Sequence, residues 1–242
     1  MTTTQNPTIQ PALAEQTLAQ LACDLPGATA IFHQYRLDFC CGGQKTLAAA
    51  AEQKQIDLTT LLSELAALTD DSGDDVDWRE QSASTLIDHI LSRFHQRHRQ
   101  QLPELIRLAR RVEQVHGDRP ECPNGLADHL SRMHQELESH MMKEEQILFP
   151  LLRRNPVTMA TGPISVMHHE HVQHGESIEH IDTLTNNITP PPGACNTWRA
   201  LYTGLQELKE DLMAHIHLEN NVLFAGACKV KEGGNTCQCQ CH

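Results

Sequence analysis

Two short stretches of the sequence place a histidine and a glutamate four positions apart. They read HMMKEEQILF, which begins at His140, and HIHLENNVLF, which begins at His215. On an α-helix, residues i and i+4 lie on one face, one turn apart. His140 and Glu144, and likewise His215 and Glu219, can therefore direct an imidazole and a carboxylate toward one point. A metal ion is the ligand that such a pairing suits.

A further histidine precedes each pair at nearly the same distance. His95 lies 45 residues before His140, and His171 lies 44 residues before His215. The surrounding FHQRH and EHVQH share a His-x2-His spacing. A single His-x3-Glu pair is weak evidence, because such pairs are common on solvated helix faces. The tandem repetition, with the apolar tails ILF and VLF behind each glutamate, favours a buried metal site instead.

The elements that must position these residues are four long segments with helical spacing. They span roughly residues 80–116, 125–153, 164–187 and 196–227. The intervening loops contain GDRPECPNG, RNPVTMATGP and TPPPGA. Four long helices with short connections predict an up-down-up-down bundle. At ~1.5 Å per residue, all of the histidines and glutamates above fall near one height of the bundle, so we expect them to face one layer of its core.

Imidazole and carboxylate ligands together suit iron, zinc or manganese. Six protein ligands are too many for one metal that keeps open positions, and they suit two metals with two histidines on each and both glutamates bridging. Carboxylate-bridged metal pairs in four-helix bundles are typically di-iron or di-manganese. The sequence therefore predicts a dinuclear centre with the ligands His95, His140, Glu144, His171, His215 and Glu219.

Other polar residues near this layer carry weaker expectations. His98 and His174 lie one turn beyond the first histidine of each half, and we expect solvated positions for them rather than a supporting role. His116 lies too far along its helix to join the cluster. Glu136 could orient a ligand imidazole, and Glu170 could line an access path.

A second chemical feature is the stretch DFCCGG, which holds Cys40 and Cys41 beside Gly42 and Gly43. Adjacent thiols can form a strained disulfide, bind a soft metal or attack an electrophile. The two glycines let the backbone turn sharply. A functional role as the catalytic pair is favoured over two buried small side chains.

The chain as a whole is predicted to be all-α. We expect a small helical domain with the cysteine pair over 1–68, an acidic linker over 69–79, the bundle over 80–228 and a flexible tail over 229–242. The tail contains a C-x-C-x-C-H run made of Cys237, Cys239, Cys241 and His242. That run either captures a soft metal or is incidental.

Composition excludes several classes of function. Aromatic residues make up only 4% of the 242 residues, which leaves little material for a sheet. The formal net charge of −12 argues against binding nucleic acid. There is no apolar run long enough to span a membrane and no secretory signal, so we expect a cytoplasmic protein without a membrane partner. Nine cysteines, an odd number, argue against a complete disulfide framework.

The sequence also resembles the RIC family, for repair of iron centres, whose members are hemerythrin-like di-iron proteins of iron-sulfur cluster repair. The resemblance covers nearly the whole chain and is carried by YRLDFCCGG, FHQRHRQQLPEL, SHMMKEEQILFP, GPISVMHHEH, TPPPGACNTW and HIHLENNVLF. It implies a hemerythrin-like bundle with two iron ions, joined by carboxylates and an oxo or hydroxo bridge, at the six ligands above. It also marks Cys40 and Cys41 as the functional pair of the small domain.

Three functions follow as alternatives. The first is repair of clusters damaged by nitrosative or oxidative stress, with damaged iron-sulfur proteins as partners and with iron supplied or nitric oxide processed at the di-iron site. The second is a carrier or sensor that binds oxygen or nitric oxide, although a carrier has no need of DFCCGG. The third is an enzyme that reduces nitric oxide at two irons, which leaves the assignment as an enzyme uncertain. A homodimer is compatible with the sequence, which does not decide the oligomeric state.

Overall fold

The computed structural model describes residues 13–25, 27–68, 76–154 and 157–229, and within these ranges the regular secondary structure is helical. The predicted all-α class is confirmed. The C-x-C-x-C-H run and most of the predicted linker lie outside the described residues. Within the described ranges, no helix is at once long and apolar enough to cross a lipid bilayer.

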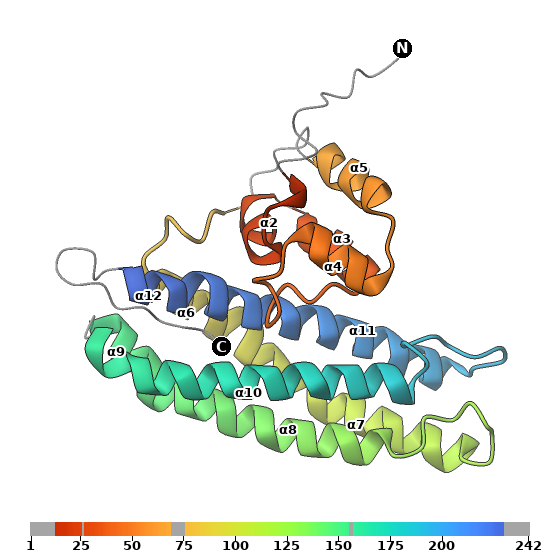
Figure 1. The fold of residues 1–242 in the computed structure, drawn as a ribbon. Coiled ribbons are helices and arrows are strands. Elements are labelled where there is room, and N and C mark those ends of the chain that lie inside the picture. The colour runs from red at the N-terminus through yellow and green to blue at the C-terminus, as the bar shows by residue number, and fades with distance from the viewer. Residues whose placement is uncertain (1–12, 26, 69–75, 155–156, 230–242) are drawn as a thin grey trace.

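Among the described residues, four short helices lie ahead of the bundle. They are α2 (Leu18–Asp24), α3 (Ala28–Tyr35), α4 (Leu47–Lys54) and α5 (Leu58–Leu68). Threonine side chains start two of them: Thr17 accepts a hydrogen bond from the backbone N–H of Gln20, and Thr46 accepts one from Ala49. Such caps satisfy N–H groups that have no partner within the helix. Figure 1 shows these helices packed on one side of a long bundle.

Four rods make up the bundle, and three of them contain π-helical turns. The first joins α6 (Ala83–Ile90), η1 (Leu91–His95) and α7 (Gln96–His116). The second joins α8 (Leu126–Lys143), η2 (Glu144–Leu148) and α9 (Phe149–Arg154). The third is α10 (Val157–Leu184) alone. The fourth joins α11 (Asn196–His217), η3 (Leu218–Phe224) and α12 (Ala225–Lys229). The rods lie lengthwise beside one another in Figure 1.

The third rod begins earlier than its sequence predicts. A loop through RNPVTMATGP was expected, yet α10 starts at Val157 and runs through Pro163. A proline inside a helix removes one backbone hydrogen bond. Here Ala160, Ile164 and Met167 all bury side chains on the same helix, and this apolar packing offsets the missing bond.

The hydrophobic core is divided into two clusters along the bundle. One fills the end of the bundle where loops join α7 to α8 and α10 to α11, which we call the loop end, and continues into the N-terminal helices. The other fills the opposite end, formed by α6, α9 and α12. On the second rod, Met141 belongs to the first cluster and Leu148 to the second, with Glu144 between them. The fourth rod repeats this order with Ile216 and Leu223. A polar layer therefore crosses the bundle between two apolar regions.

Candidate metal centre

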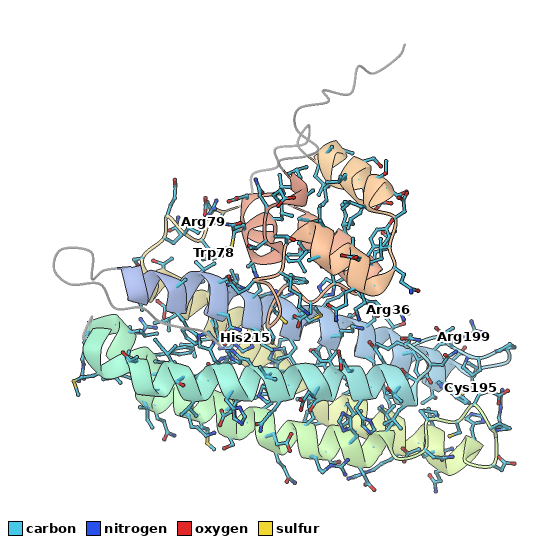
Figure 2. The ribbon with its side chains drawn as sticks, in the orientation of Figure 1. Arg36, Trp78, Arg79, Cys195, Arg199 and His215 are labelled. Atoms are coloured by element: carbon cyan, nitrogen blue, oxygen red, sulfur yellow. The ribbon has the colours of Figure 1, made fainter. Side chains whose placement is uncertain are left out.

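Six side chains from all four rods meet in this polar layer. They are the predicted ligands His95, His140, Glu144, His171, His215 and Glu219, and each is at most 1% exposed. His215 is seen at mid-length of the bundle in Figure 2. Burying so many ionisable groups is costly unless they are paired or bind a metal. The structure thus brings together every residue that the spacing singled out.

The six residues form two sets of four that share both glutamates. His95 and His215 complete one set with Glu144 and Glu219, and His140 and His171 complete the other with the same two carboxylates. Within each set, the candidate ligand atoms lie within 4.8 Å of one another. Two sets that share two carboxylates can hold two cations side by side.

Each glutamate turns one oxygen toward each set. Glu144 Oε2 lies 3.4 Å from His95 Nε2, and its Oε1 lies 3.4 Å from His140 Nε2. Glu219 does the same, because its Oε1 lies 3.1 Å from His215 Nε2 and its Oε2 lies 3.1 Å from His171 Nε2. This splitting of the two oxygens between the two sets is the arrangement of a bridging carboxylate.

Unsatisfied polar atoms provide a test of whether the residues fit a metal. Both oxygens of Glu144 and Nε2 of His95 are buried and make no hydrogen bond. His140 Nε2 and His171 Nε2 lie 3.1 Å apart. Two nitrogen lone pairs at this distance repel each other unless one of the nitrogens is protonated. A cation between these atoms would satisfy all of them, and the donor set therefore fits a metal pair.

The pKa shifts in the layer also favour a site for two metal ions. Burial raises the pKa of Glu144 well above its usual value, and the charge of Glu219 raises it further. Burial alone would also raise the pKa of Glu219, but His215 and His171 hold it well below its usual value. The pKa of His140 is lowered well below 6.5, first by burial and then by His171. Without a metal, the layer thus favours the protonated form of Glu144, whereas cations favour the ionised form of both glutamates and the neutral form of the histidines.

Three of the four imidazoles are oriented by a partner on the ring nitrogen that faces away from the layer. The Nδ1–H of His95 donates to Glu145 Oε1 at 2.8 Å, and that of His140 donates to Glu170 Oε2 at 2.9 Å. His171 Nδ1–H donates to Asn220 Oδ1 at 2.8 Å. These bonds fix the tautomer that leaves Nε2 free for a metal.

The orienting groups were only partly predictable. Glu136 was expected in this role, but its side chain is exposed and Glu170 takes the position instead. Glu170 itself is held by an ion pair with Lys143. Glu145 and Asn220 each directly follow one of the two shared glutamates. That common position, EE in one motif and EN in the other, is the signal that could have identified them.

Replacing Asn220 by alanine is expected to lower iron affinity by about 10–100-fold, the usual cost of losing a partner behind a metal-bound histidine. The variant leaves His171 without its Nδ1 acceptor. Asn221→Ala is the matched control, because Asn221 contacts His217 and the Phe39 carbonyl instead. Competition with a chelator measures both affinities. Equal affinities in the two variants would contradict the role of Asn220.

His98 and His174 were expected in solvent, and both are buried. His98 is fully buried with its ring centroid 5.4 Å from that of His215, and His174 is 3% exposed with its centroid 4.9 Å from that of His140. Neither ring makes a hydrogen bond in the described structure. Burial lowers the pKa of His174 to about 3 and that of His98 well below 6.5. The expectation failed because helix rotation, which decides exposure, is not readable from i,i+3 spacing.

The π-helical turns coincide with the candidate ligands. Segment η1 ends at His95, η2 begins at Glu144, and η3 contains Glu219. Such turns insert an extra residue into a helix and are often found at functional sites. Their presence explains how Glu145 and Asn220 come to face the cluster from positions adjacent to a ligand. A sequence analysis that assumes 3.6 residues per turn throughout does not predict these π-helical turns.

The DFCCGG turn lies against the bundle beside this centre. Cys40 is 5% exposed, Cys41 is half-buried, and their sulfurs are 3.6 Å apart, so the pair is reduced. The thiol of Cys41 donates to the backbone carbonyl of His171 at 3.4 Å. Asn220 Nδ2 donates to the Cys40 carbonyl at 3.0 Å while its Oδ1 holds His171. The thiol turn and one candidate ligand are therefore joined through a single amide.

Cys23, Cys122, Cys195 and His116 are not among the residues grouped around the two shared glutamates. His116 is at the end of α7, with its Nε2 3.3 Å from the sulfur of Cys195, and Figure 2 places Cys195 at the loop end of the bundle. The sulfur of Cys23 lies 3.6 Å from His217 Nε2. Cys122 is buried in the first apolar cluster. As expected, His116 does not join the six residues.

Comparison with known proteins gives two family matches and many relatives. The model described as "Hemerythrin HHE cation binding domain" matches residues 86–227, and the model described as "Domain of Unknown function (DUF542)" matches residues 14–69. The chain is 53% identical to the iron-sulfur cluster repair protein YtfE of Dickeya chrysanthemi, over 89% of this chain and 97% of that protein. It is 52% identical to the protein of the same name from Escherichia coli O1:K1, over 89% of this chain and 98% of the relative.

Proposed function

The chain belongs to the RIC family of hemerythrin-like iron-sulfur cluster repair proteins, and from that premise we propose that its six buried residues hold two iron ions used in repair. The proposed ligands are His95 and His215 for one ion and His140 and His171 for the other. Glu144 and Glu219 bridge the two. An oxo or hydroxo bridge completes the proposed centre.

The observation that carries this proposal is the sharing of Glu144 and Glu219 between two sets of four candidate ligands. A centre for one metal would need only one set. Histidine supplies four of the six ligands, so the site holds fewer negative charges than a cluster of carboxylates would. Fewer anionic ligands hold a cation less tightly, which suits a centre that gives iron away.

Iron bound here would supply releasable metal and a redox partner for small diatomic molecules. The protein's own residues determine how firmly that iron is held. Glu145, Glu170 and Asn220 orient three imidazoles, and the apolar clusters on both sides of the layer exclude water. Low water access strengthens every electrostatic interaction inside the layer.

Cys40 and Cys41 are proposed as the reactive pair that serves damaged iron-sulfur proteins. Support comes from their place on the wall of a cavity and from their contact with His171. We further propose that the protein works in the cytoplasm during nitrosative or oxidative stress. Nitric oxide is the proposed small ligand of the centre.

The proposal is tested by adding the iron-loaded protein to a dehydratase whose 4Fe–4S cluster has been damaged by nitric oxide, and by following the return of dehydratase activity. Recovery is expected with the iron-loaded chain and not with the metal-free chain. A Cys40→Ser/Cys41→Ser variant should restore little activity, whereas Cys195→Ser, which changes a thiol at the loop end, should behave as the parent. Tight, reversible binding of nitric oxide without any recovery would instead indicate a carrier or sensor.

A further inference from the structure

We propose that Cys40, Cys41 and Asp38 form a second metal site, separate from the six-residue centre, for a thiophilic divalent cation such as ferrous iron or zinc. The two sulfurs and one carboxylate oxygen lie within 4.8 Å of one another. Thiolate ligands select zinc and iron over hard cations such as magnesium and calcium, and one carboxylate is compatible with either metal.

The spacing of the three atoms matches the edges of a tetrahedral site. Metal–sulfur bonds of ~2.3 Å place two sulfurs about 3.8 Å apart, and a ~2.1 Å metal–oxygen bond places an oxygen about 3.6 Å from each sulfur. The observed Cys40–Cys41 sulfur separation is 3.6 Å, and Cys40 Sγ lies 3.4 Å from Asp38 Oδ1. A cation therefore needs only small movements of side chains. A disulfide, in contrast, needs the sulfurs to close to about 2.05 Å.

The backbone holds these groups in place before any metal binds. Asp38 Oδ1 accepts hydrogen bonds from the backbone N–H groups of Cys40 and Cys41, and Oδ2 accepts one from Gly42. A Cβ at Gly42 would lie 2.8 Å from Asp38 Oδ2, and one at Gly43 would lie 2.4 Å from the Phe39 carbonyl oxygen. Only glycines permit this close turn. The sulfurs are thus presented by a rigid loop, which lowers the entropy cost of binding.

Binding is an exchange of protons for metal. Each thiol loses one proton to solvent, and two metal–sulfur bonds and one bond to Asp38 replace three metal–water bonds. The two thiolates and the carboxylate leave the bound dication with one net negative charge, and no oxidation state changes. The hydrogen bond with Cys41 and burial raise the pKa of Cys40 well above its usual value, so a cation that binds this thiol must displace its proton. Metal binding at this turn therefore strengthens as the pH rises.

A cavity gives the site an approach from solvent. It has a volume of about 660 Å³ and lies between the N-terminal helices and the bundle, with Cys40, Cys41, Val172 and Gly175 among its lining residues. Asp38, Glu176, Glu179 and Asp182 place carboxylates on the same wall. The thiol of Cys41 itself contacts the backbone carbonyl of His171. The turn therefore lines the cavity and also contacts a candidate ligand of the six-residue centre, so an ion bound at the turn would be held next to that centre.

Naming iron as the cargo rests on the proposed function, but the site itself can be tested without iron chemistry. Cobalt(II) is a suitable probe, because thiolate ligands give it a sulfur-to-metal charge-transfer absorption that histidine and carboxylate ligands do not. The full chain carries Cys237→Ser, Cys239→Ser and Cys241→Ser, so that tail thiols do not contribute. It is first loaded with no more than two iron ions per chain, the number that the six-residue centre is proposed to hold. Cobalt is then titrated while the near-ultraviolet absorption is recorded.

One cobalt per chain is expected to saturate the thiolate band. Cys40→Ser and Cys41→Ser, each added separately, should weaken this binding by at least about tenfold, because losing a ligand costs no less than losing an outer partner behind one. Cys195→Ser should leave it unchanged, and far-ultraviolet circular dichroism verifies that each variant is folded. An undiminished band in the Cys40→Ser/Cys41→Ser variant, or no band in the parent, would overturn the site. Iron content measured in the same samples shows separately whether the six-residue centre binds iron, so the two proposals fail independently.

Discussion

Replacing Glu144 by leucine is expected to abolish binding of both iron ions while making the metal-free protein more stable. Glu144 offers one oxygen to each set of ligands, so its loss removes a bridge that an apolar group cannot replace. Iron affinity should fall more than about 100-fold, beyond the cost of losing an outer partner. Without metal, both carboxylate oxygens are buried without a hydrogen bond, and leucine removes that penalty. The gain in unfolding free energy should be about 1–3 kcal/mol, the usual cost of a buried polar group without a hydrogen bond.

Two measurements on the same variant check this expectation. Metal analysis after iron loading gives the iron content, and guanidinium denaturation of the metal-free forms gives the stability. Glu136→Leu is the control, since Glu136 is exposed on the same helix and should change neither quantity much. Glu219→Leu should lose iron in the same way. Full iron retention in either bridge variant would refute the shared-carboxylate assignment.

Acid is expected to destabilise the metal-free protein well above the pH at which surface carboxylates titrate. Burial lowers the pKa of His174 to about 3 and that of His217 to about 4, whereas both titrate near 6.5 in the unfolded chain. Above pH 6.5 neither state is protonated at these sites and their contribution is constant. Between pH 6.5 and 5 the unfolded chain gains protons that the folded chain excludes, so stability falls by about 2 kcal/mol for each histidine.

Glu144 acts in the opposite direction, because its raised pKa lets the folded state hold a proton that the unfolded state has lost. The contribution of each histidine to the pH dependence of stability is therefore measured better in a variant that lacks it than from the parent protein alone. Denaturation of metal-free protein between pH 7 and pH 5 should show a flatter profile for His174→Gln and for His217→Gln. His169→Gln, an exposed change on α10, should keep the parent slope. A parent slope in both buried variants would show that these histidines are protonated in the folded state.

The sequence was sufficient to predict the bundle and the convergence of six residues because both depend on local periodicity. His140 with Glu144, and His215 with Glu219, needed only the i,i+4 rule, and the loop positions aligned the heights. The structure places all six in one buried layer. The start of α10 before Pro163 was missed because the prolines and glycine of RNPVTMATGP indicate a loop, whereas the burial of Ile164 and Met167 stabilises a helix there.

What could not be predicted depends on helix rotation and on contacts between distant segments. The π-helical turns at His95, Glu144 and Glu219 change the facing of the residues next to them, so Glu145 and Asn220 reach the histidines. The contact of Cys41 with His171 joins residues 130 positions apart. The domain boundaries and the role of the tail stay predictions.

The polar layer between the two apolar clusters also bears on how the molecule unfolds. Apolar contacts are what make a domain unfold as a single unit, and in this bundle they stop on both sides of the layer. Ligands from all four rods lie in that interval, so a cation bound there ties the two clusters to one another. Metal occupancy is therefore expected to make the unfolding of the bundle more cooperative, in addition to supplying the chemistry of the site.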